Sequence, residues 1–122
     1  MMNLWLIGCG AMALDYAKVS KAQGIEFTVI GRGIKSAQRF EEVTKISVTT
    51  DGLSQALSGA EAPEVAIVAV GVEQLARATT QLLQKGTRRI LLEKPGGLNV
   101  NELSELDQQA KSAGAEVLLA YN

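Results

Sequence analysis

The residues best suited to chemistry begin with a run of small residues near the N-terminus. Residues 8 to 13 read G-x-G-x-x-A, directly after the apolar run Leu4–Ile7 and at the head of a helical stretch. A diphosphate needs backbone amides with no side chain in the way, and its charge is favoured at the positive end of a helix. Gly8 permits a tight turn, Gly10 permits close approach, and Ala13 lets helix and strand pack together. The run therefore predicts a dinucleotide site.

Five residues of this turn are expected to contact the diphosphate: Gly8, Cys9, Gly10, Ala11 and Met12. The alternative is a strand-to-helix turn whose small residues serve packing alone. The next apolar run, which starts at Phe27, lies at the spacing of a dinucleotide site and favours binding. Cys9 itself is expected to be small filler rather than a nucleophile, because nothing in the sequence supplies a base for it.

The segment after the second apolar run favours a phosphorylated ribose. An acidic residue about 20 positions past the glycines commonly holds the ribose 2′-hydroxyl of NAD. Here the chain has Gly31, and Arg32, Lys35 and Ser36 follow it. These residues offer positive charge and a hydroxyl to a 2′-phosphate, so we expect NADP(H) to be favoured over NAD(H). Two alternatives stay open: both cations could be solvated loop residues, or Arg32 could stack on adenine in either cofactor.

A lysine follows the fifth apolar run, in the sequence Glu93-Lys94-Pro95. Ligands of open α/β sheets bind at the carboxyl ends of the strands, and a proline restricts the backbone of the residue before it. Lys94 could then exchange a proton with a carbonyl or hydroxyl oxygen as hydride moves, and Glu93 could orient it or contact the nicotinamide ribose. The alternative is an ordinary lysine of a surface loop.

Short apolar runs alternate with longer amphipathic stretches along the chain, a pattern typical of strands joined by crossover helices. Continuous apolar runs are typical of strands buried on both faces of a parallel sheet, and apolar repeats predict helices over residues 72–83 and 103–113. The predicted fold class is therefore a doubly wound α/β Rossmann fold with a mostly parallel six-stranded sheet in the order 3-2-1-4-5-6. The predicted strands are Leu4–Ile7, Phe27–Ile30, Ile46–Thr49, Val65–Val70, Ile90–Leu92 and Glu116–Tyr121.

Length and composition narrow the function classes. A chain of 122 residues with 47% hydrophobic residues fits one domain, and a net charge of -1 argues against nucleic acid as a partner. With no histidine and one cysteine, no metal cluster or disulfide is expected. No apolar run approaches a membrane span, and no signal peptide is evident, so a cytoplasmic location is expected. The last predicted strand runs into Asn122, so we expect the chain, 1–122, to be a truncated domain that lacks a substrate domain.

Taken together, the glycine turn, the Glu-Lys-Pro corner and a final strand ending in Tyr121-Asn122 resemble the glucose-fructose oxidoreductase, inositol dehydrogenase and rhizopine-catabolism protein (Gfo/Idh/MocA) family. The resemblance covers the first of that family's two domains. It implies that Lys94 lies beside the nicotinamide and the substrate, that Asn122 lies near the same ring, and that the Lys94–Pro95 bond is cis. A further catalytic Asp and His, the substrate pocket and the oligomer contacts would belong to the second domain.

The loop after the fourth strand departs from the family. The family often has Thr-Pro there and a histidine four residues later, where this chain has Val70, Gly71 and Leu75. Backbone and small residues still suffice to cover the cofactor. The resemblance implies hydride transfer on a sugar, cyclitol or nucleotide-sugar. Two alternatives remain: a dehydrogenase of another Rossmann group, such as an amino-acid dehydrogenase, or a non-catalytic dinucleotide-sensing regulator.

Overall fold

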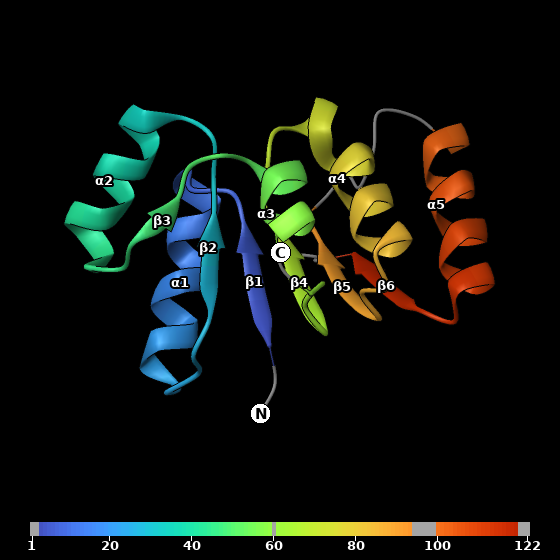
Figure 1. The fold of residues 1–122 in the computed structure, drawn as a ribbon, viewed down its shortest axis with the longest axis horizontal. Helices are drawn as coiled ribbons and strands as arrows, with labels where there is room; N and C mark the ends of the chain where they lie inside the picture. Colours follow the sequence, from blue (N-terminus) through green and yellow to red (C-terminus); the bar gives the residue numbers. More distant parts are fainter. Residues whose placement is uncertain (1–2, 60, 94–99, 120–122) are drawn as a thin grey trace.

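A single parallel sheet organises the molecule (Figure 1). The computed structural model describes residues 3–59, 61–93 and 100–119. Its six strands lie in the order β3-β2-β1-β4-β5-β6, and every neighbouring pair is parallel, which confirms the predicted fold class. The strands are β1 (Leu4–Ile7), β2 (Thr28–Ile30), β3 (Val48–Thr49), β4 (Val65–Val68), β5 (Arg89–Leu92) and β6 (Glu116–Leu119).

Helices cover both faces of the sheet, as parallel strands with crossover connections require. Two of them, α1 and α2, pack over the half of the sheet that holds β1, β2 and β3, and the other three pack on the opposite face (Figure 1). The helices are α1 (Ala11–Ala22), α2 (Ile34–Thr44), α3 (Leu53–Gly59), α4 (Val72–Gln84) and α5 (Val100–Ala113).

The alternation of side chains along β1 divides the core into two clusters. Trp5 and Ile7 pack with α3, α4 and α5, whereas Leu6 packs with α1 and α2 around the fully buried Phe40. All three β1 side chains are at most 6% exposed, so the continuous apolar run is explained by burial on both faces. The glycine turn therefore follows directly after a strand that is held on both faces by the core.

The predicted strands and helices are present among the described residues, and the differences lie at their ends. Helix α5 begins at Val100 rather than at residue 103, and the last two positions of the predicted sixth strand, 120 and 121, lie outside the described residues. The fourth strand was expected to reach Val70, but β4 ends at Val68, and α4 already has its N-cap at Gly71. The edge strand β3 contains only Val48 and Thr49, because it pairs with β2 alone. Hydrophobicity marks where a strand is buried, but the hydrogen-bonding partner decides where the ladder stops.

The sheet reverses its order of connection between β1 and β4, which are direct neighbours. From β1 the chain proceeds outward through β2 to β3, then returns to β4 and proceeds the other way to β6. At such a point the loops beyond the carboxyl ends diverge and leave a crevice, the usual ligand site of open α/β sheets. The candidate site is therefore expected beyond Ile7 and Val68.

Candidate nucleotide-binding cleft

The turn after β1 depends on a glycine at position 8. Gly8 has φ +120°, which side chains rarely tolerate, and its amide donates to Ile30 O at 2.7 Å. A Cβ added to Gly8 would collide with the backbone carbonyl of Ala69. The glycine therefore lets the chain turn sharply while it stays in contact with the end of β4.

Gly10 has a different role, because the space where its side chain would be is open. It is the N-cap of α1, with φ -89° and ψ -163°, and a Cβ there would meet no atom within 4 Å. The helix receives no side-chain cap and has no acidic residue in its first turn. Its first amides and its positive end thus remain available to an anion that approaches over Gly10.

Helix α2 begins in the same way on the other side of the turn. Its N-cap is Gly33, it has no side-chain cap, and its first turn lacks an acidic residue. Helix α4 differs: Glu73 lies in its first turn, and the carboxylate of Glu73 lies 2.7 Å from where a Cβ of Gly71 would be. The positive ends of α1 and α2 are thus free for anions, whereas that of α4 is already faced by a carboxylate.

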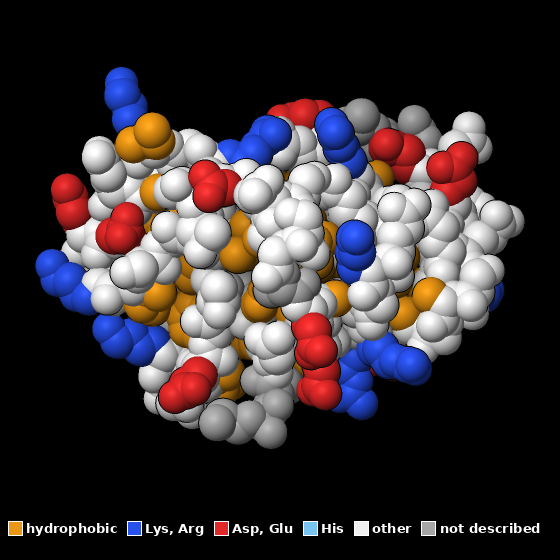
Figure 2. Space-filling view, viewed as in Figure 1, with side chains coloured by type: hydrophobic (Ala, Val, Ile, Leu, Met, Phe, Trp, Pro, Cys, Tyr) orange, Lys and Arg blue, Asp and Glu red, His pale blue; other side chains and the backbone are white. Residues whose placement is uncertain are grey.

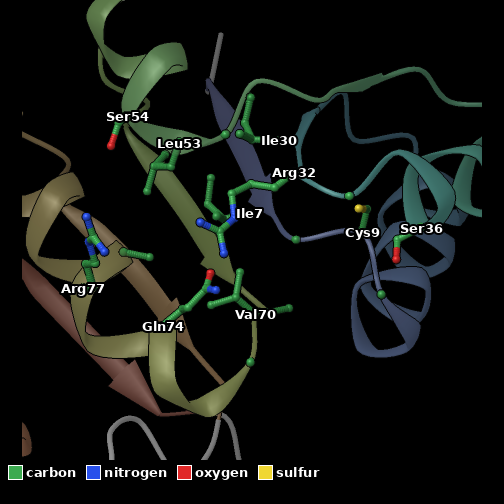
Figure 3. A pocket seen from close by; sticks show the side chains of 18 of the residues that line it. Ile7, Cys9, Ile30, Arg32, Ser36, Leu53, Ser54, Val70, Gln74 and Arg77 are labelled. Atoms are coloured by element: carbon green, nitrogen blue, oxygen red, sulfur yellow. The ribbon is translucent and has the colours of Figure 1, made fainter.

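A cleft of about 820 Å³ opens at this edge of the sheet (Figure 3). Its volume lies within the range of small-molecule and cofactor sites. It is lined by the turn after β1, the loop after β2, the segment from β3 into α3, and the loop after β4 together with one face of α4. These are the connections at the carboxyl ends of four neighbouring strands, so the cleft lies where the topology places a ligand.

The structure brings half of the predicted residues to this cleft. Those that line it are Gly8, Cys9, Gly10, Arg32, Ser36, Val70 and Gly71. Ala11 and Met12 do not line it with their side chains but belong to the exposed first turn of α1, and Lys35 is exposed nearby on α2. Leu75 of α4 is 1% exposed and packs in the core, so its side chain faces away from the cleft. Lys94 with its peptide bond to Pro95, and Asn122, lie outside the described residues.

Arg32 is the cation nearest the end of β2 and has no ion-pair partner in the described ranges. Its side chain is exposed, and its Cγ and Cδ lie 3.3 and 3.4 Å from where a Cβ of Gly52 would be. Figure 3 shows the side chain extending into the cleft toward the side from which Gln74 and Arg77 project. The absence of a side chain at Gly52 therefore gives Arg32 a surface to lie on as it reaches across.

Cys9 is buried against the sheet and is no nucleophile here. Burial raises the pKa of the Cys9 thiol, and the backbone amide of Arg32, which hydrogen-bonds the sulfur, offsets part of that effect. The group is therefore neutral at physiological pH, whereas a reactive cysteine needs a lowered pKa. This agrees with the expectation that Cys9 is filler.

Sequence reasoning missed the wall of the cleft formed by α3 and α4. The residues of this wall that it did not anticipate are Asp51, Gly52, Leu53, Ser54, Glu73, Gln74, Arg77, Ala78 and Gln81. The amide of Gln81 donates to the hydroxyl of Ser54 at 2.7 Å and ties the two helices together. The rule that ligands bind beyond strand ends pointed to the loop after β3, but no pattern marked which face of α4 would line the site.

A hydrogen bond links the first helix to the Glu-Lys-Pro corner. The Tyr16 hydroxyl donates to Glu93 Oε2 at 2.6 Å, across 77 positions of sequence. Burial, this hydrogen bond and the charge of Glu93 raise the pKa of Tyr16 to about 12. Glu93, expected to contact the nicotinamide ribose or orient Lys94, is therefore held in place from α1, a contact that nothing in the sequence indicated.

On the face shown in Figure 2, acidic and basic side chains are interspersed rather than gathered by sign. Within residues 3–59, 61–93 and 100–119, no three His, Cys, Asp or Glu residues come together in a group that could hold a metal ion. No helix in that part of the chain has the length and apolar character to cross a membrane.

The comparisons with known proteins agree on the fold. A family model described as an oxidoreductase family with an NAD-binding Rossmann fold (Gfo/Idh/MocA) matches residues 2–121. No curated protein sequence matches the chain. Among solved structures, the WlbA dehydrogenase of Bordetella pertussis, with NADH and UDP-GlcNAcA, is similar with a TM-score of 0.84 at 16% identity, over 97% of this chain and 36% of that one.

Two further structures with this fold have names that point to different substrates. Biliverdin reductase of Synechocystis, with biliverdin and NADP+, has a TM-score of 0.80 at 19% identity, over 97% of this chain and 37% of that one. The UDP-N-acetylglucosamine 3-dehydrogenase GnnA of Acidithiobacillus ferrooxidans has a TM-score of 0.79 at 17% identity, over 97% and 36%. The chain thus spans about a third of the length of these solved structures.

Proposed function

The chain belongs to the Gfo/Idh/MocA family of NAD-binding oxidoreductases, and from that premise we propose that its cleft binds NADP(H), with the diphosphate over Gly10. The observation that carries the proposal is the open space at Gly10, in front of the uncapped first turn of α1. A dinucleotide diphosphate fits there because it can accept hydrogen bonds from the free amides of Ala11 and Met12. Gly8 and Cys9 shape the same turn.

The adenosine end of the cofactor is assigned to the loop after β2. Arg32 and Ser36 line the cleft there, beside the uncapped N-terminus of α2, and Lys35 adds a nearby positive charge. A 2′-phosphate would gain charge-assisted hydrogen bonds from this group, whereas Gly31 offers no carboxylate to a 2′-hydroxyl. Asp51 and Glu73 also line the cleft, so the preference for NADP(H) rests on the position of Arg32 and not on an overall positive charge.

The nicotinamide end is assigned to the opposite side, near the ends of β4 and β5. Val70 and Gly71 line the cleft there, and Tyr16 fixes the carboxylate of Glu93. By the family resemblance, Lys94 is the acid or base for the substrate oxygen, with Asn122 near the same ring. When bound, the nicotinamide supplies hydride transfer to or from a carbon that carries oxygen.

We further propose that the full activity acts on a CH–OH group of a sugar, cyclitol or nucleotide-sugar. Two of the similar structures carry nucleotide-sugar names, which supports this class, although biliverdin reductase has the same fold. Because those chains are about three times as long as this one, we assign the substrate pocket, the remaining catalytic groups and the oligomer contacts to a second domain. Residues 1–122 then form the dinucleotide-binding domain.

A fluorescence titration of NADPH and NADH tests the proposal with a variant at Gly10. The backbone angles of Gly10 suit any residue and its Cβ would meet open space, so Gly10→Val should fold normally yet block the diphosphate. We expect the affinity for both cofactors to fall by about tenfold or more. Gly59→Val, also at an open position but away from the cleft, is the matched control. Unchanged binding by Gly10→Val would refute the assignment.

A further inference from the structure

Gly31 directly follows β2, at a position where the backbone itself does not demand glycine. Its φ is not among the positive values that mark Gly8 or Gly52. Its amide donates to Thr49 O at 2.8 Å and its carbonyl accepts from Gly52 N at 3.1 Å, bonds that any residue could make. The reason for glycine must therefore lie in the space around the Cα rather than in the backbone conformation.

That space is filled by Cys9. A Cβ built on Gly31 would lie 2.5 Å from Cys9 Sγ and 3.3 Å from Cys9 Cβ, with Val48 Cγ1 at 3.2 Å on the other side. Cys9 is only 8% exposed and packs in the cluster beneath α1 and α2, so its sulfur has little room to move. A side chain at Gly31, which itself lines the cleft, would thus start between Cys9 and Val48, against the glycine turn at the edge of the cleft.

We infer that Cys9 and Gly31 form a matched pair that determines cofactor specificity: the side chain at position 9 keeps position 31 free of any side chain, and so free of the carboxylate that would select NAD(H). The inference rests on the proposed function of the cleft, because specificity has meaning only where a dinucleotide binds. In this account the side chain of Cys9 acts through position 31, while its backbone remains part of the turn proposed to hold the diphosphate. Position 9, between the two glycines of the turn, and position 31, directly after β2, then constrain each other sterically.

A double-mutant cycle in thermal stability tests the steric part without any cofactor. Gly31→Ala adds only the Cβ, and we expect it to lower Tm by roughly 5 °C or more in the chain with Cys9. In the Cys9→Ala background the same substitution should cost less than half as much, because the sulfur is gone. Gly33→Ala is the matched control: its Cβ would meet Ser36 atoms only at 3.7 Å or more, so its effect should not depend on residue 9. Equal Tm losses from Gly31→Ala in the two backgrounds would overturn the pairing.

Cofactor titrations of Gly31→Asp test the specificity part. Combined with Cys9→Ala, Gly31→Asp should shift the ratio of NADH to NADPH affinity toward NADH by about tenfold or more. Gly31→Asp alone should shift the ratio less or fail to fold, and the alanine cycle then decides between strain and other causes. An equal shift with and without Cys9→Ala contradicts the inference. Failure of the unmodified chain to bind either cofactor would instead refute the proposed function. The double-mutant cycle in Tm would still test the steric coupling between Cys9 and Gly31, because it needs no cofactor.

Discussion

In the proposed function, the choice of cofactor depends on the side chain of Arg32. Because Arg32 is exposed, solvent and salt screen its charge. Its contribution to binding therefore comes from its position in the cleft and not from a buried ion pair. With no carboxylate partner among the described residues, its donors are available to a phosphate. Two roles remain for it: pairing with a 2′-phosphate or stacking on adenine.

Arg32→Ala separates these roles. A charge-assisted hydrogen bond contributes roughly 1.5–3 kcal/mol, so we expect NADPH affinity to fall by about tenfold or more and NADH affinity to change little. Raising the salt concentration should shrink the difference. The control is Arg39→Ala, because Arg39 is an exposed arginine of α2 that does not line the cleft. Equal losses for the two cofactors would show that Arg32 stacks on adenine.

Tyr16 gives a pH-dependent signature of the contact between α1 and the end of β5. Its pKa of about 12 lies above the ordinary value of about 10, because burial and Glu93 disfavour the phenolate. Stability from this contact is fully present below about pH 10 and is lost as the pH rises toward 12. We expect Glu93→Gln to lower the Tyr16 pKa, measured by the ultraviolet absorbance of phenolate, with Tyr16→Phe identifying its signal against that of the second tyrosine. An unchanged Tyr16 titration in Glu93→Gln would show that the hydrogen bond does not form.

Helix α4 connects the core to the cleft. Leu75 and Leu82 on one face are fully buried, while Gln74, Arg77 and Gln81 on another face line the cleft. Thr79, also fully buried, donates its hydroxyl to Leu75 O at 2.8 Å within the helix. The position of the cleft wall therefore depends on how α4 packs on the sheet.

Leu82→Ala tests that dependence. Truncating a fully buried leucine should destabilise the fold by about 2–5 kcal/mol, measured by denaturant unfolding, since a cavity is left at the centre of the α4 contact. Leu118→Ala on β6 is the matched control, because Leu118 is 54% exposed and loses little burial. A loss in Leu82→Ala no greater than that of Leu118→Ala would mean that α4 is not seated as described.

The elements were predictable from sequence to different degrees, for physical reasons. The strand interiors were found because burial on both faces leaves continuous apolar runs such as Leu4–Ile7, and α4 because its apolar repeat is regular. The ends of β3 and β4 were not, because pairing partners fix them. The glycine turn was recognised because its backbone needs are local, whereas the Tyr16–Glu93 contact and the fit of Cys9 against Gly31 join distant positions and require the folded chain.

At the scale of the whole molecule, two of the cavities formed by the described residues lie at opposite ends of the strands. The cleft of about 820 Å³ lies at the carboxyl ends, and a second cavity of about 690 Å³, lined by Leu4, Gly24 and Glu26 among others, lies near the amino ends of β1 and β2. Volume alone does not choose between them. The free positive ends of α1 and α2 and the position of Arg32 favour the first for a diphosphate.

A titration of the isotopically labelled chain with NADPH, followed through its backbone amide resonances, tests the location of the cofactor most directly. The proposed site predicts that the largest shift changes occur at Gly8, Gly10 and Arg32, and that Gly24 and Glu26 at the opposite end of the strands change little. If the largest changes occurred at Gly24 and Glu26, or if no resonance moved at saturating NADPH, the assignment of the cleft as the dinucleotide site would be wrong.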